Sequence, residues 1–231
     1  MSVAPDDASA GSTPSAAPAF ASTIDSVDEL RTYYREPNEF VRNKETSVLD
    51  DGCARFIATS TFVLVATSDR DGRLDVSPRG GPAGFVKVID ERRLVIPDLN
   101  GNNRLDSLCN VIEHDQIGLL FLIPGSGETL RVNGRAWVTV DDEILDLFVG
   151  ELRRPISAIG VEVEQAFVHC AKSVRRGGLW TPDAWPDPAA RPSPGQMLVD
   201  HAGVADQITG AQLDGLLEQG YASDLAADAP D

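Results

Sequence analysis

A short polar segment, Gly101 to Arg104, stands directly before a run of residues with helical spacing. The apolar positions of that run, Leu105, Leu108 and Ile112, recur on one face of a 3.6-residue period. Asparagines at this place are typical helix caps, because they accept hydrogen bonds from free backbone N–H groups. A helix N-terminus also attracts anions. Arg104 favours the anion site, since an arginine in the first turn opposes the helix dipole and needs another reason to be there.

Other polar residues could complete a phosphate site with Arg104. They lie on the polar face of a predicted strand or at the end of an element: Ser77, Arg79, Asn103, Arg131, Arg135 and Lys172. The planar guanidinium of arginine suits bidentate recognition of phosphate. The alternative is that each cation pairs with one of the abundant Asp and Glu side chains, and both interpretations stay open.

Other kinds of site lack their sequence patterns. The three histidines, His114, His169 and His201, are scattered without metal-ligand spacing, so we expect no metal site. The Gly-Ser-Gly at 125–127 lacks the context of a nucleophile elbow. Residues 81–87 lack the Gly-Lys-Ser/Thr ending of a phosphate-binding loop, and no Rossmann fingerprint is present. We name no residue as a catalytic acid or base.

Composition restricts the partners and the compartment. The net charge of −16 argues against non-specific binding to nucleic acid or to an anionic membrane, and no apolar run is long enough to span a bilayer. The N-terminus lacks the features of a secretory signal. Cys53, Cys109 and Cys170 are few and far apart, which favours a reducing, cytoplasmic compartment.

The elements that must position the polar residues are mostly strands. Strand-like runs cover 61–68, 73–80, 84–90, 92–98, 116–123, 128–140 and 158–170. Helical patterns cover 26–36, 49–60, the run after Arg104, 142–150, 196–201 and 210–218. About six strands with helices packed outside them predict a mainly β, α+β fold, namely a six-stranded antiparallel barrel.

Alternation within two strands indicates which side chains share a face. In 73–80, Leu74 and Val76 face one way, while Asp75, Ser77 and Arg79 face the other. In 128–140, the apolar face is predicted to hold Leu130, Val132, Ala136 and Val138, opposite Arg131, Asn133, Arg135 and Trp137.

Composition also divides the chain into three parts. Residues 1–24 are rich in Ala, Ser and Pro and predict a disordered leader. Residues 25–185 contain the N-terminal helices and the barrel, and 186–231 form a Pro-rich segment followed by an acidic helical tail.

The segments "DVSPRG" (75–80) and "GNNRLDSL" (101–108), together with the strand order and hairpin turn around them, resemble the pyridoxamine 5′-phosphate oxidase-like family of FMN-binding split barrels. The resemblance covers roughly residues 45–180. It implies a six-stranded split barrel that forms a homodimer, with one FMN at each of two sites in the interface.

The resemblance also implies roles for individual residues. Arg104 would hold the FMN phosphate, with Asn102 and Asn103 beside it. The strand of Val76, Ser77, Pro78 and Arg79 would run along the isoalloxazine ring and ribityl chain, Arg131 would reach across the interface, and Lys172 would complete the site. The chain departs from the oxidase proper, because 61–68 carries no cation and the C-terminus is acidic. Pyridoxine phosphate is therefore not the expected substrate.

Three functions remain after these observations. The first is an FMN-dependent oxidoreductase acting on an unidentified small molecule. The second is a flavin carrier, sensor or store without turnover, in which the Pro-rich segment 179–188 covers the flavin. The third is a haem-handling relative, for which His114 or His169 would have to serve as axial ligand.

Overall fold

The computed structural model describes residues 20–230 and divides the chain into two compact units. In the first unit, which ends at Asn43, helix α1 (Val27–Tyr33) is capped by Ser26, whose hydroxyl accepts a hydrogen bond from the backbone N–H of Glu29. The one-turn helix α2 (Glu39–Arg42) follows. The helix predicted within 26–36 is confirmed, whereas residues 1–19 of the predicted leader lie outside the described residues.

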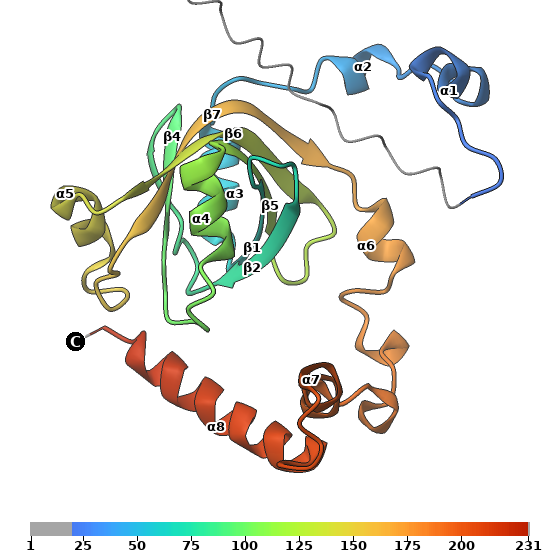
Figure 1. The fold of residues 1–231 in the computed structure, drawn as a ribbon. Coiled ribbons are helices and arrows are strands. Elements are labelled where there is room, and N and C mark those ends of the chain that lie inside the picture. The colour runs from blue at the N-terminus through green and yellow to red at the C-terminus, as the bar shows by residue number, and fades with distance from the viewer. Residues whose placement is uncertain (1–19, 231) are drawn as a thin grey trace, which may run out of the picture. The chain divides into compact units, whose positions relative to one another are not determined.

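The second unit is built on one antiparallel sheet in the order β2-β1-β5-β6-β7-β4-β3 (Figure 1). The strands are β1 (Phe62–Ser68), β2 (Leu74–Gly80), β3 (Lys87–Asp90), β4 (Arg93–Pro97), β5 (Gln116–Leu122), β6 (Thr129–Thr139) and β7 (Ala158–His169). The expected barrel with flanking helices is confirmed. Its sheet has seven strands rather than six, because each of the seven strand-like runs in the sequence, including the one that contains the short strand β3, forms a strand of the same sheet.

The core lies where the alternating faces of the strands turn inward. Leu130, Val132 and Ala136 of β6 are fully buried and Val138 packs against them, as their alternation predicts. The ladder between β6 and β7 shifts register next to Gly134. A Cβ at Gly134 would collide with the carbonyl oxygen of Glu162, so the close approach of the two strands requires glycine there.

Strand β2 alternates as predicted, but its apolar side chains lie on the exposed side. Leu74 is 84% and Val76 60% exposed, while Asp75, Ser77 and Arg79 are half-buried. Because β2 is the terminal strand of the sheet, nothing in the described part of the chain covers this apolar face. An edge strand with exposed apolar side chains is a surface on which another chain can pair or pack.

Two longer helices flank the barrel. Helix α3 (Asp51–Thr59) lies within the predicted range 49–60; it is capped by Asp50 and turns Cys53 and Ile57 into the core, with Phe56 packed beside them. Helix α4 (Asp106–Glu113) packs against β1, β2 and β6.

The predicted apolar face of α4 is only partly correct. Leu108 is buried, but Leu105 and Ile112 are exposed, and the face against the barrel holds Ser107 and Val111 instead. Leu105 lies before the helix in a left-handed conformation and so does not share the helical period, while Ile112 lies within α4 on its solvent side.

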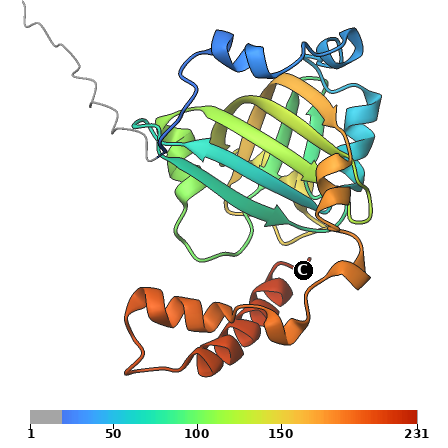
Figure 2. The ribbon, with the colours of Figure 1, turned by 90° about the vertical axis from the view of Figure 1, so that its right-hand side faces the viewer.

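The remaining helices connect or follow the strands. Helix α5 (Asp142–Leu145) and the 3-10 turn η1 (Asp146–Phe148) precede β7, and α6 (Lys172–Arg176) follows it. Two short 3-10 turns, Pro182–Ala184 and Pro188–Ala190, lead to α7 (Pro194–Ala202) and α8 (Gly210–Ala227), which pack against each other (Figure 2). The two predicted C-terminal helices are confirmed. Among residues 20–230, no helix combines the length and the hydropathy needed to cross a membrane.

Candidate functional site

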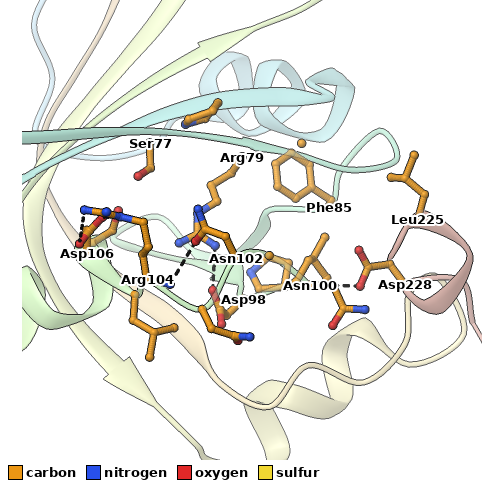
Figure 3. A pocket seen from close by; sticks show the side chains of 18 residues that line it. Ser77, Arg79, Phe85, Asp98, Asn100, Asn102, Arg104, Asp106, Leu225 and Asp228 are labelled. Atoms are coloured by element: carbon orange, nitrogen blue, oxygen red, sulfur yellow. Dashed lines mark hydrogen bonds and ion pairs between the residues drawn. The ribbon is translucent and has the colours of Figure 1, made fainter. Parts of the chain in front are cut away.

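A pocket of about 430 Å³ lies between β2, the loop from Pro97 to Leu105 and the start of α4. Its size is within the range of small-molecule sites. Six of the residues predicted from the sequence line it: Ser77, Pro78, Arg79, Asn102, Asn103 and Arg104 (Figure 3). The structure therefore brings together two segments, 77–80 and 97–107, that the sequence linked by their polar character and by the resemblance they carry.

The backbone of the loop prepares the start of α4. Asn103 and Leu105 both have positive φ, of 58° and 60°, and the side chain of Asn102 accepts a hydrogen bond from the N–H of Arg104 at 3.0 Å. No side chain caps the first turn of α4. The interpretation of the asparagines as caps of the helix is therefore wrong, because Asn102 stabilises the turn before α4 instead of its first turn. The uncapped N-terminus of α4 leaves backbone N–H groups available to an anion.

Arg79 joins the two walls of the pocket. Its guanidinium donates to Asp98 at 2.7 Å, and both side chains are about one-fifth exposed. Asp98 follows directly after β4, so this ion pair ties β2 to the loop that carries Asn102 and Arg104. Half-buried, hydrogen-bonded pairs of this kind restrict geometry more than surface pairs do.

Arg104 lies two residues before α4, not in its first turn as predicted. It donates to Asp106 at 2.8 Å, and 72% of its side chain is exposed. The hydrogen bond that Arg104 donates to Asp106 and the negative charge of Asp106 raise the pKa of Arg104, and the charge of Asp75 adds to the effect. Asp106 is the residue that meets the positive end of the helix dipole, so Arg104 causes no conflict there.

The alternative of ion pairing thus holds for several candidate cations. Arg79 pairs with Asp98, Arg104 with Asp106, and Arg135 with Asp115. The charged side chains that line the pocket are those of Arg79, Asp98, Arg104, Asp106 and Asp228. Of these, Asp228 has no ion pair within the described chain.

Asp75 is a residue of the site that the sequence did not single out. Its carboxylate accepts hydrogen bonds from Ser77 at 2.9 Å and from Ser107 at 2.8 Å. Ser107 is the second residue of α4 and is almost fully buried. The alternation of β2 had placed Asp75 on the same face as Ser77 and Arg79, so this signal was available. Nothing in the sequence indicated Ser107.

Three of the residues predicted from the resemblance lie away from the pocket in a single chain. Val76 is on the exposed face of β2, opposite Ser77. Arg131 is on the outer face of β6, with its guanidinium 5.5 Å from the ring centroid of Phe167. Lys172 is the exposed first residue of α6.

The histidines and cysteines show no arrangement for metal binding or nucleophilic chemistry. Across the described residues, no group of three His, Cys, Asp or Glu side chains could hold a metal ion. His114 bonds to the hydroxyl of Ser68 at 2.9 Å. Burial lowers the pKa of His169, and the charges of Arg131 and Lys44 lower it further. Burial raises the pKa of Cys53 to about 11, which leaves its thiol protonated at neutral pH.

A family model described as pyridoxamine 5′-phosphate oxidase matches residues 49–170, which is more than half of the chain. Among solved structures, HupZ of Group A Streptococcus is 15% identical, with 52% of this chain and 92% of that chain covered at a TM-score of 0.43.

Two further structures are similar in the same way. A protein related to general stress protein 26, of the pyridoxinephosphate oxidase family, from Clostridium acetobutylicum is 13% identical, with 50% and 84% covered and a TM-score of 0.36. An FAD binding protein from Mycobacterium smegmatis is 14% identical, with 54% and 97% covered and a TM-score of 0.36. A comparison with curated proteins finds no match.

Proposed function

Because the chain belongs to the pyridoxamine 5′-phosphate oxidase family, we propose that it is a flavoprotein that binds FMN and acts as an oxidoreductase on a small molecule. The observation that carries the proposal is the pocket beside α4, where an uncapped helix N-terminus, two serine hydroxyls and two arginines surround one space. A bound flavin would supply the redox chemistry, taking up a hydride and passing electrons to oxygen or another acceptor.

The residues of the pocket fit the phosphate end of FMN. The N–H groups at the start of α4 are donors, and the hydroxyls of Ser77 and Ser107, which donate to Asp75, lie beside the same space. Arg104, whose side chain is 72% exposed, has room to turn toward a phosphate. Its ion pair with Asp106 is a surface pair, and such pairs contribute little. A phosphate dianion is the stronger partner, so binding would draw Arg104 from Asp106. The half-buried pair of Arg79 and Asp98 would stay in place and hold the wall.

A homodimer is part of this proposal. The exposed apolar face of β2, with Leu74 and Val76, is a surface that a second copy could cover. In such a dimer Arg131 and Lys172, which lie away from their own pocket, would contribute to the site of the partner. The mass of the purified protein in solution tests this, and Val76→Asp should shift it toward the monomer. A wild-type protein that stays monomeric at high concentration would remove this part.

The charges of the chain argue against one class of substrate. The strand β1 carries no cation and the C-terminal helix is acidic, so we do not propose pyridoxine phosphate as the substrate. Storage or transport of flavin without turnover remains the second candidate, favoured because the described residues that line the pocket include no His, Cys, Lys or Tyr side chain. We also propose a cytoplasmic location, which the three free cysteines support.

The first experiment is the visible absorption spectrum of the purified full-length protein, followed by denaturation and identification of the released chromophore. We expect flavin maxima in the blue and near-ultraviolet, and FMN in the supernatant. Anaerobic mixing with candidate reductants then separates the two functions, because an oxidoreductase bleaches and a store does not. A colourless protein that takes up no added FMN would refute the proposal.

A further inference from the structure

The pocket has one wall that lies outside the region matched by the family. Leu225 and Asp228, at the C-terminal end of α8, line it together with the loop after β4 (Figure 3). These residues follow the matched region by more than fifty positions. The residues that form this wall therefore come from a part of the chain that the family model does not cover.

Two hydrogen bonds tie the end of α8 to the barrel. The carboxylate of Asp228 accepts from the backbone N–H of Asn100 at 3.2 Å, and its backbone carbonyl accepts from the N–H of Arg153 at 3.0 Å. Asn100 lies four residues before Arg104 in the same loop. The carboxylate of Asp228 therefore lies at the Asn100 end of this loop, away from Arg104 and the start of α4, where the proposed phosphate group would bind (Figure 3).

The carboxylate of Asp228 differs from the other carboxylates that line the pocket in its ion pairing. Asp98 and Asp106 are each neutralised by an arginine, whereas Asp228 has no cationic partner within residues 20–230. A single phosphate held by α4 and Arg104 need not approach Asp228. A second phosphate attached to the first would bring more negative charge toward an unpaired carboxylate, and its substituent would meet Leu225.

We propose that Leu225 and Asp228 determine which flavin the pocket accepts, admitting a flavin that ends in one phosphate and excluding one whose phosphate is extended, as in a dinucleotide. The proposal rests on the proposed function, since it concerns the same pocket. Asp228 acts by charge and Leu225 by volume. Both reach the site only because α8 returns to the loop after β4.

The test compares the affinities of the full-length apoprotein for FMN and for FAD, measured by the quenching of flavin fluorescence. Wild type should bind FMN at least about 100-fold more tightly than FAD, because repulsion and steric exclusion act together. Asp228→Asn keeps an oxygen that can accept from Asn100 but removes the charge, and Leu225→Ala removes the volume. The double variant should lower the FMN-to-FAD ratio about tenfold or more, mainly through tighter FAD binding.

Asp224→Asn is the matched control, because it removes the same charge one turn earlier on α8 and does not line the pocket. It should leave the ratio unchanged. Far-UV circular dichroism checks that each variant keeps its helices. Wild type that binds FMN and FAD equally, or a double variant with an unchanged ratio, overturns this inference and leaves the proposed function standing. Wild type that binds neither flavin overturns both.

Discussion

Asp75 offers the sharpest test of how the pocket is built, because its replacement should move stability and affinity in opposite directions. In the structure its carboxylate accepts from Ser77 and from the buried Ser107, and so links β2 to α4. Asp75→Asn replaces these charge-assisted bonds by at most weaker neutral ones. Hydrogen bonds to charged groups contribute roughly 1.5–3 kcal/mol and neutral ones roughly 0.5–1.5 kcal/mol. We therefore expect the free energy of unfolding of the apoprotein to fall by about 2 kcal/mol.

The same substitution should favour the binding of FMN. It removes a negative charge beside the proposed phosphate position, and in a partly solvated site one like charge is worth roughly 1 kcal/mol, or about fivefold in affinity. It also frees both serine hydroxyls to donate to the phosphate. FMN should therefore bind several-fold more tightly to the variant.

Urea denaturation of the apoprotein measures the stability, and fluorescence titration with FMN measures the affinity. Asp71→Asn is the control, because Asp71 is an exposed residue of the β1–β2 turn whose one ion pair among residues 20–230 is with Arg73. It should change neither quantity appreciably. If Asp75→Asn weakened FMN binding along with stability, Asp75 would be a ligand-positioning group that the bound state needs, and the reasoning above would be wrong.

Three further predictions concern separate parts of the chain. Arg104→Ala should weaken FMN binding about 10- to 100-fold, measured by titration. Arg135→Ala should leave the affinity unchanged, because the ion pair of Arg135 with Asp115 lies outside the pocket. Equal affinities of the two variants for FMN would remove Arg104 from the phosphate site. His169 has a lower pKa in the folded chain than its ordinary value of 6.5, so the imidazole of the unfolded chain takes up a proton first as the pH falls. Stability should then fall as the pH drops from 6.5 toward the folded pKa, and His169→Gln should lose less stability than wild type between pH 7.5 and 5.5 in urea titrations. Gly134→Ala should abolish folding or greatly lower the melting temperature, because its Cβ meets the backbone of Glu162, while Gly160→Ala, with its nearest neighbour 3.9 Å away, should be tolerated sterically.

Strands and their faces were readable from the sequence because alternation reports burial directly. The inward face of β6, from Leu130 to Val138, was predicted residue by residue, and helical patterns located α3 and both C-terminal helices. The same alternation in β2 did not reveal which face is exposed, because that depends on what lies next to an edge strand. Periodicity records which residues share a face, but not what covers it.

The candidate site was only partly readable. Arginine and asparagine in front of a helical run pointed to the loop at 101–104, and Ser77 and Arg79 pointed to the opposite wall. Asp98 and Asp106 could not be assigned as partners, because ion pairing depends on side-chain geometry. Asp228 could not be found at all, since 128 residues separate it from Asn100, and no local pattern spans that distance.

Leu105 gives the loop before α4 a further significance for engineering. A leucine in the left-handed region stores roughly 1–2 kcal/mol of conformational strain, which asparagine tolerates far better. The chain therefore holds an unused reserve of stability at the mouth of its pocket. Leu105→Asn would release that reserve if the leucine serves only as a connector. A variant that gained stability but lost its ligand would show that the strain is the cost of a surface the ligand needs.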